Sequence, residues 1–252
     1  MTTRISILAL VLAAGLTTLS APAQAAPPAN IAAALADPSR PAADVARDAA
    51  RKPAELLALA DIKTGDKVAD FVIGGGYVTR ILSAAVGPTG HVYAYQPAEF
   101  IKFQASYGEN LKKVADAYKN VTPLDASFQQ LDLPDGLDAI VTVQNYHDLY
   151  LKPFPAGTAA KVDAELFKSL KPGGVLLVVD HAALPGSGIS AADSLHRIDP
   201  AAVKSDLKAA GFVLESESPL FHDAADPHTT NVFDPSIRGK TDQFTLVFRK
   251  PR

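Results

Sequence analysis

Cysteine is absent from this 252-residue sequence, and its absence removes several kinds of chemistry. A chain without thiols has no disulfide framework, no thiolate metal site and no cysteine nucleophile. The absence is compatible with an oxidising compartment, although no covalent crosslink then supports the fold. Stability must therefore come from a hydrophobic core.

Basic charge and long apolar runs are also scarce. The formal net charge is -3 and no basic run occurs, which argues against nucleic acid or an anionic membrane surface as the main partner. The apolar run ISILALVLAAGL, at residues 5 to 16, is shorter than the roughly 20 residues of a membrane-spanning helix. A small-molecule substrate is the expected partner, and the sequence leaves the oligomeric state open.

Residues 1–25 have the features of a secretory signal peptide. Arg4 precedes the apolar run, and Ala23-Gln24-Ala25 follows it after a polar break, as an A-x-A cleavage site. We expect cleavage before Ala26, a periplasmic or secreted product and no stable membrane insertion afterwards. The alternative is an N-terminal anchor that is never cut. The remaining chain fits one α/β domain.

Residues 26–54 are predicted to form an N-terminal helical arm. An Ala- and Pro-rich lead is followed by RPAADVARDAARKP at residues 40 to 53, where charged residues recur at i,i+4 spacing. Arg47 and Arg51 lie on the adjoining helix face. Two interpretations stay open: a solvated helix with ion pairs along it, or an arm that lies over a pocket.

From residue 67 onward, strand-like and helix-like patterns alternate. KVADFVI, HVYAYQ, VTPLD, LDAIVTVQN and GVLLVVDH are typical of buried strands, and helical segments separate most of them. This alternation predicts an α/β fold with a parallel sheet covered on both faces. The last strand-like segment, DQFTLVFRK, follows an irregular stretch and stands apart.

The stretch DFVIGGGYVTR, residues 70 to 80, places three glycines between a strand and a helix. Glycine has no Cβ, so the backbone there can turn tightly with positive φ and approach a ligand. In open α/β sheets, ligands bind past the carboxyl ends of the strands. The loop is therefore the first candidate for a binding site.

These motifs resemble class I S-adenosylmethionine-dependent methyltransferases from about residue 55 to the end. Four of them, DFVIGGG, GHVYAY, LDAIV and LKPGGVLLVVD, occur in the family's order and spacing. The resemblance implies a methyltransferase-like domain over 55–252, a Rossmann-like doubly wound seven-stranded sheet in the order 3-2-1-4-5-7-6, and an antiparallel strand 7. GGGYVTR, VVDHAALPG, LHRIDP and RGKTDQFTL resemble more narrowly a bacterial group of predicted, often exported, methyltransferases.

The resemblance also implies a set of residues for S-adenosylmethionine. Gly74 and Gly76 match the second and third glycines of the family's loop, and Val72 replaces the first. Gln96 stands where the family has an acid for the ribose hydroxyls, and an amide lacks the charge that strengthens such bonds. The residues assigned to the cofactor are Asp70, Gly74, Gly75, Gly76, Gln96, Asp125 and Asn145. The open alternative is a glycine turn that keeps the fold without binding a ligand.

Candidate catalytic residues follow the fourth and fifth strands, in NYHDLY (145 to 150) and DHAALPG (180 to 186). His147 and His181 are candidate general bases because imidazole titrates near neutral pH, and Tyr146 is a candidate for orienting the acceptor. Each histidine is equally interpretable as a hydrogen-bonded structural residue at a strand end.

A second polar set comes later in LHRID, FHDAADPH and RGKTD, where histidines and aspartates mix. A metal site of nitrogen and oxygen ligands is one interpretation, but the spacing matches no standard motif, and we assign no metal ligands. Asp199 before Pro200 is a plain helix N-cap. Arg197 and Arg238 are the candidate substrate-binding residues, because a guanidinium binds carboxylates at two points.

The leading hypothesis is an S-adenosylmethionine-dependent methyltransferase that acts on a small molecule. Two alternatives stay open: an exported, catalytically degenerate ligand-binding module on the same fold, and a metal-assisted enzyme built on Asn145, Asp148 and Asp180 with nearby histidines. The methyl acceptor is not readable from the sequence.

Overall fold

The computed structural model describes residues 26–252. The expected signal peptide, residues 1–25, lies outside the described residues. Within the described part of the chain, none of the helices combines the length and the apolar character needed to span a membrane.

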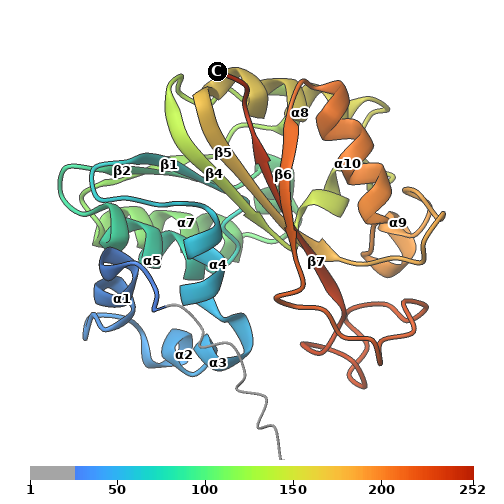
Figure 1. The fold of residues 1–252 in the computed structure, drawn as a ribbon, viewed down its shortest axis with the longest axis horizontal. Coiled ribbons are helices and arrows are strands. Elements are labelled where there is room, and N and C mark those ends of the chain that lie inside the picture. The colour runs from blue at the N-terminus through green and yellow to red at the C-terminus, as the bar shows by residue number, and fades with distance from the viewer. Residues whose placement is uncertain (1–25) are drawn as a thin grey trace, which may run out of the picture.

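Residues 26–252 form a seven-stranded sheet in the order β3-β2-β1-β4-β5-β7-β6, so the predicted topology is confirmed. β7 pairs antiparallel with both β5 and β6, whereas β1 to β5 are parallel neighbours. Figure 1 shows the sheet running through the molecule with β7 inserted beside β5. The strands are β1 (Lys67–Phe71), β2 (His91–Tyr95), β3 (Val121–Leu124), β4 (Leu137–Val143), β5 (Leu170–His181), β6 (Val213–Ser218) and β7 (Gln243–Arg249).

Helices cover both faces of this sheet, as the alternating pattern predicted (Figure 1). The α-helices are α1 (Ala29–Leu35), α2 (Ala42–Val45), α3 (Asp48–Arg51), α4 (Pro53–Leu59), α5 (Tyr77–Val86), α6 (Ala98–Phe103), α7 (Ser106–Ala117), α8 (Thr158–Ser169), α9 (Ala192–Leu195) and α10 (Pro200–Ala209). Two 3-10 helices, η1 (Phe128–Gln130) and η2 (Tyr146–Tyr150), follow β3 and β4. The predicted N-cap is confirmed, since the Asp199 carboxylate accepts the Ala201 N–H at the start of α10.

The core has two layers because successive strand side chains point to opposite faces. In β5, Leu177 and Val179 join the layer under α1, α4, α5 and α7. Their neighbours Leu176 and Val178 join the layer under α8 and α10. A sheet buried on both faces directs ligands to the loops at its carboxyl edge.

The N-terminal arm differs from the single helix that the charge spacing predicted. Its charges pair over longer distances: Arg40 binds the Asp48 carboxylate at two points, at 2.8 and 2.6 Å, and Arg80 binds Asp44 at 2.6 Å. The predicted i,i+4 partners therefore do not meet, because the chain breaks between α2 and α3 and α3 ends at Lys52 in the left-handed conformation. The arm is therefore not one continuous helix, and the ion pair between Asp44 and Arg80 of α5 holds it against the domain.

Candidate functional site

The loop after β1 keeps a glycine-like backbone where the sequence has no glycine. Val72 has φ 67°, which costs a β-branched side chain roughly 1–2 kcal/mol. The loop is held by the Tyr95 carbonyl, which accepts from the N–H groups of Val72 and Ile73, and by Asn145 Nδ2, which donates to the Val72 carbonyl at 3.1 Å. The turn that the family builds with a glycine is thus built here under strain.

Gln96 supports this loop from below. It is fully buried at the end of β2, and its Oε1 accepts the Gly74 N–H at 2.9 Å. Its Nε2 is buried as well and has no hydrogen-bond partner among the described residues. A buried amide donor without a partner destabilises a protein by about 1–3 kcal/mol. Gln96, assigned to the cofactor from sequence, does not itself line the cavity at this loop.

The three glycines have different surroundings. A Cβ on Gly74 or Gly75 would meet no atom within 4 Å, so both positions border open space. A Cβ on Gly76 would lie 2.5 Å from Val114 Cγ2, so Gly76 is needed for packing of α5 against α7. Gly74 and Gly75 therefore form the face of the loop that a ligand can approach.

Asp70, the last acid of β1, is 3% exposed and accepts a 2.6 Å hydrogen bond from the Thr79 hydroxyl. Burial raises the pKa of this carboxyl to about 6, and the bond from Thr79 opposes part of that rise. The charged form of Asp70 is therefore held in the site at a cost in stability.

Two arginines of the arm close the other side of the cavity. The Arg47 and Arg51 guanidinium groups each lie 5.2 Å from the centroid of the Tyr77 ring. Burial, followed by the like charge of Arg47, lowers the pKa of Arg51. The Tyr77 hydroxyl donates to Asp48 at 2.7 Å and so fixes the ring on which both arginines lie. Two neighbouring positive charges, an exposed one on Arg47 and a partly buried one on Arg51, favour an anion beside them.

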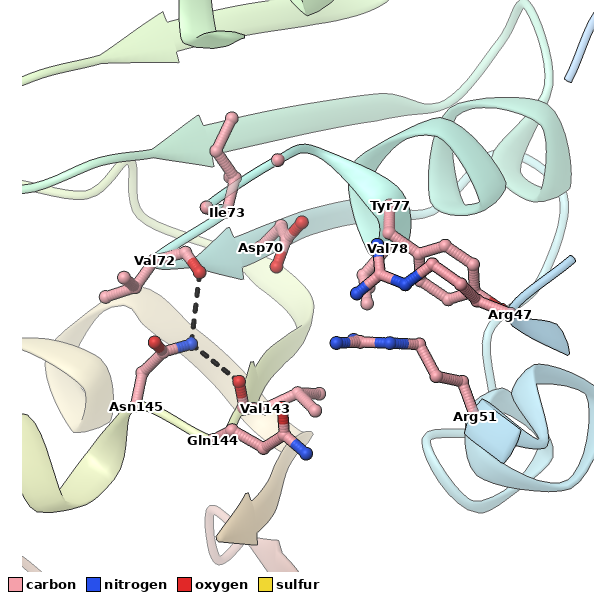
Figure 2. Close-up of a pocket in the computed structure, with 12 residues that line it drawn as sticks. Arg47, Arg51, Asp70, Val72, Ile73, Tyr77, Val78, Val143, Gln144 and Asn145 are labelled. Carbon is pink, nitrogen blue, oxygen red and sulfur yellow. Dashed lines mark hydrogen bonds between the residues drawn. The ribbon is translucent and has the colours of Figure 1, made fainter. Parts of the chain in front are cut away.

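Together these elements enclose one cavity of about 160 Å³ (Figure 2). In Figure 2 the Arg51 side chain reaches across the cavity toward Val143, while Arg47 lies along Tyr77. The volume is below the roughly 300 Å³ of typical small-molecule sites, so the arm in this position leaves room for part of such a ligand. The lining residues are Arg47, Arg51, Asp70, Val72, Ile73, Gly74, Gly75, Tyr77, Val78, Val143, Gln144 and Asn145.

Some of the residues assigned from sequence lie elsewhere. Asp125 is exposed after β3 and does not line this cavity. Tyr146 is 1% exposed, belongs to the core layer under α8 and donates its hydroxyl to Asp163 at 2.9 Å. The geometry therefore favours a structural role for Tyr146 over the predicted orientation of an acceptor.

The two candidate bases lie near each other, with ring centroids 6.1 Å apart: His147 is in η2 after β4, and His181 is the last residue of β5. His147 Nδ1 lies 2.8 Å from Asp180 Oδ1, and His181 Nδ1 lies 2.8 Å from the Thr241 hydroxyl. Burial alone would lower the pKa of His147, but the carboxylates of Asp180 and Asp148 outweigh it and raise that pKa to about 10. Burial lowers the pKa of His181 to about 4.

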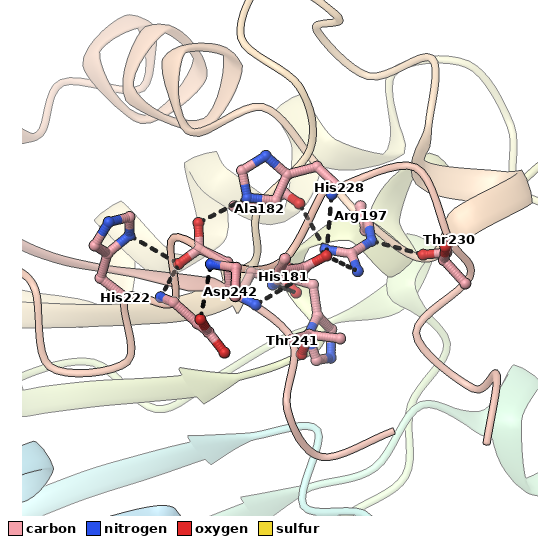
Figure 3. A network of polar contacts seen from close by, with 12 residues as sticks. His181, Ala182, Arg197, His222, His228, Thr230, Thr241 and Asp242 are labelled. Atoms are coloured by element: carbon pink, nitrogen blue, oxygen red, sulfur yellow. Dashed lines mark hydrogen bonds and ion pairs between the residues drawn. The ribbon is translucent and has the colours of Figure 1, made fainter. Parts of the chain in front are cut away.

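Neither predicted substrate-binding arginine lines the cavity. Arg197 is fully buried, donates to both oxygens of Asp226 at 2.8 and 3.1 Å, and donates to the carbonyls of Ala182 and Thr230 (Figure 3). Every nitrogen of this guanidinium has a protein partner, so Arg197 joins the C-terminal segment to the end of β5. Arg238 is exposed and lies over the Phe233 ring.

Asp226 belongs to a larger network in the same segment, residues 219–242. It also accepts the backbone N–H groups of His228 and Asp242. The Asp242 carboxylate in turn contacts the rings of His222 and His228, at 3.0 and 2.8 Å (Figure 3). The two histidine rings of FHDAADPH thus contact Asp242 at the end of the segment, and its Asp226 pairs with Arg197.

Sequence reasoning missed two features of this edge. Tyr77 was not recognised as the ring that carries both arginines, although an aromatic residue directly after a glycine loop is a usable signal. His196 was grouped with the later polar set, whereas it contacts His147, with 3.2 Å between His147 Nε2 and His196 Nδ1. The connection from β5 through α9 brings it back to η2.

Comparisons with known proteins agree with this architecture. No protein-family model matches the chain. Over 125 residues the chain is 29% identical to a protein-L-isoaspartate O-methyltransferase from Ignicoccus hospitalis, a match that covers 50% of this chain and 52% of that protein. The chain spans about half the length of the curated relatives it matches.

Solved structures resemble the chain over more of its length. A SAM-dependent methyltransferase from Aquifex aeolicus superposes with a TM-score of 0.58 at 21% identity, over 85% of this chain and 94% of that one. The [4+2]-cyclase SpnF superposes with a TM-score of 0.57 at 17% identity, over 81% of each chain. The chain has the class I S-adenosylmethionine-dependent methyltransferase fold, and the homologous methyltransferases match about half of its length.

Proposed function

We propose that this protein is an S-adenosylmethionine-dependent methyltransferase that acts on a small molecule. The observation that carries the proposal is the cavity at the glycine loop. There, open space at Gly74 and Gly75 and the arginine pair border one volume at the carboxyl end of β1. Gln96 does not line this cavity and holds Gly74 through its Oε1. The fold and the partial homology to methyltransferases support the same activity.

The residues present fit S-adenosylmethionine. Arg47 and Arg51 would hold its carboxylate, because a guanidinium pairs with a carboxylate through charge-assisted hydrogen bonds. Gln96 is fully buried and outside the cavity lining, so its Nε2 would donate to the nucleoside only after the glycine loop shifts. The glycine face leaves room for close approach of the ligand. When bound, the cofactor supplies a methyl group made electrophilic by a sulfonium centre.

The chain's own residues would position the two reactants and exclude water. Methyl transfer needs alignment above all, and a base only when the acceptor must lose a proton. Asn145 fixes the strand ends by donating from its Nδ2 to the carbonyls of Val72 and Val143. The arm above the cavity would have to shift to admit a whole cofactor, since the present volume is about 160 Å³.

We also propose that the mature protein starts at Ala26 and is periplasmic or secreted, as in the exported methyltransferase group that the motifs resemble. The support is the pattern of residues 1–25 alone. Mass spectrometry of protein recovered from the periplasm is expected to give Ala26 as the first residue. A full-length species in the membrane fraction would contradict this.

Calorimetry with S-adenosylmethionine, S-adenosylhomocysteine and adenosine tests the proposed cofactor. We expect both sulfur compounds to bind more tightly than adenosine, which lacks the carboxylate. Gly75→Val should abolish binding with little loss of stability, because Gly75 has no positive φ and its Cβ would enter open space. Gly76→Ala is the matched comparison and should instead destabilise the fold through Val114.

A second measurement separates an enzyme from a binding module on the same fold. Incubation with S-adenosylmethionine and a library of small acceptors should yield S-adenosylhomocysteine in proportion to enzyme, and the Gly75→Val protein should yield none. Tight binding without turnover on any acceptor would favour the binding module. Absence of binding for all three nucleosides would contradict the proposal itself.

A further inference from the structure

Three potential metal ligands converge at the carboxyl ends of β4 and β5, outside the cavity described above. His147 Nε2 lies 3.2 Å from Asp148 Oδ1 and 3.2 Å from His196 Nδ1. The remaining pair, His196 Nδ1 and Asp148 Oδ1, is 3.9 Å apart. Among residues 26–252 this is the group of histidine and carboxylate atoms close enough together to hold one ion.

These separations match a shared metal ion. Zinc lies about 2.0–2.1 Å from histidine nitrogen and about 2.0–2.2 Å from carboxylate oxygen, so tetrahedral ligands are roughly 3.3–3.5 Å apart. Two of the three observed separations are 3.2 Å, and the third exceeds the tetrahedral value by a few tenths of an ångström. A side chain 24% exposed, His196, carries that third separation and has room to adjust.

The ligand His147 also has the support that metal-binding histidines require. Its second nitrogen, Nδ1, lies 2.8 Å from Asp180 Oδ1, and Asp180 is fully buried. The other oxygen of Asp180 accepts the backbone N–H of His147 at 2.7 Å. A carboxylate behind the ring fixes the tautomer that leaves Nε2 free for a metal.

The backbone around His196 holds this residue close to His147. It ends α9 with φ 53°, in the left-handed region. Two residues later, Ile198 bridges to Ala182 just after β5, which fixes His196 against η2. The centroid of the Phe233 ring lies 4.8 Å from that of the His196 ring.

We propose that His147, Asp148 and His196 bind one divalent transition-metal ion, with Asp180 orienting His147. Two imidazoles and one carboxylate suit Zn²⁺ or Fe²⁺, and three protein ligands leave a coordination position for water or a substrate oxygen. The site is distinct from the proposed cofactor cavity and does not depend on methyl transfer. The competing explanation is metal-free: a charged His147 shared between Asp180 and Asp148.

The test is zinc binding by the full chain and by two matched variants. His196 and His228 both have positive φ, at 53° and 60°, similar side-chain exposure, at 24% and 21%, and an aspartate partner. Asparagine tolerates that backbone. Equilibrium dialysis against Zn²⁺ should give one ion per chain for the parent and for His228→Asn. His196→Asn should weaken binding by at least about 100-fold, more than is typical for loss of a supporting group.

A second variant probes the supporting carboxylate. Asp180→Asn should weaken zinc binding by about 10–100-fold, with far-UV circular dichroism used to confirm that the protein is folded. Co²⁺ in place of Zn²⁺ should give visible absorption bands that disappear in His196→Asn and persist in His228→Asn. The proposal is overturned if the parent binds Zn²⁺ with a Kd above about 1 mM. Equal loss of zinc in both histidine variants, or unchanged binding in His196→Asn, would also overturn it.

Discussion

Two polar regions at the carboxyl edge of the sheet differ in how completely their charged and polar groups are paired. Around Arg197 and Asp226, each buried charge has an opposite charge or a hydrogen bond, so the C-terminal segment needs no ligand to satisfy its buried charges. Around the glycine loop, the protein holds an ionised acid in a buried place, two neighbouring arginines, an unpaired amide and a strained valine. The first region stabilises the fold, whereas the second stores free energy that a ligand can release.

The difference shows why residue type alone misleads. Arg197 and Arg51 both place a guanidinium group near the strand ends. From the sequence, Arg197 was predicted to bind the substrate, and Arg51 was not. The structure gives Arg197 a complete set of protein partners and leaves Arg51 on an aromatic ring beside another positive charge. A buried polar group whose partners all come from the protein, such as Arg197, has a structural role. A charged group held without such partners, such as Arg51, is the better candidate for binding a ligand.

The largest expected effect on stability comes from disrupting the ion pair between Arg197 and Asp226. Arg197→Met leaves Asp226 buried without its cation, and removal of one partner of a buried ion pair costs about 3–5 kcal/mol. Chemical denaturation should therefore give a much lower free energy of unfolding. Arg238→Met, at an exposed arginine, is the control and should change stability by less than about 0.5 kcal/mol. Near-parental stability of the Arg197 variant would contradict the structural role.

Removing the buried charge of Asp70 near the glycine loop should instead raise the free energy of unfolding. The Asp70 carboxyl has a pKa of about 6 in the folded chain against 3.8 as its ordinary value. Between these values the folded protein binds more protons than the unfolded one, so the free energy of unfolding falls as pH rises through this window. Asp70→Asn should remove that slope and, at neutral pH, raise stability by an amount on the order of 1–3 kcal/mol. Denaturation curves measured on either side of the window check the sign.

How much of this contrast was predictable depends on what the sequence encodes locally. The sheet order and the glycine loop could be predicted, because strand and turn patterns are short-range and the motifs stand in family order. Asp70, Gly74, Gly75 and Asn145 were assigned to the site and do line the cavity. The pairing of Arg197 with Asp226 could not be predicted, because it spans an irregular loop with no periodic signal. The approach of His196 to His147 depends likewise on how α9 folds back.

Ligand affinity should distinguish the arginine pair next. Charge-assisted hydrogen bonds contribute about 1.5–3 kcal/mol each, so Arg51→Ala should weaken S-adenosylhomocysteine binding by about 10- to 100-fold. Adenosine has no carboxylate, and its affinity should be unchanged in the same variant. Stability should stay within about 1 kcal/mol of the parent, since a confined like charge is removed along with the contact to Tyr77. Equal weakening of both ligands would place the carboxylate elsewhere.

The smallest effect concerns Val72 and isolates its strain. At an ordinary backbone position, a glycine variant is less stable than the alanine variant by roughly 0.5–1 kcal/mol, because glycine loses more entropy on folding. At φ 67° the Cβ of alanine is itself unfavourable by roughly 1–2 kcal/mol, so the order should reverse or vanish between Val72→Gly and Val72→Ala. Val78, a buried valine inside α5, supplies the comparison, and there Gly should be about 1 kcal/mol less stable than Ala. If both positions give the same order in denaturation, the loop is unstrained, and the glycine-like turn at Val72 is no part of what distinguishes the two regions.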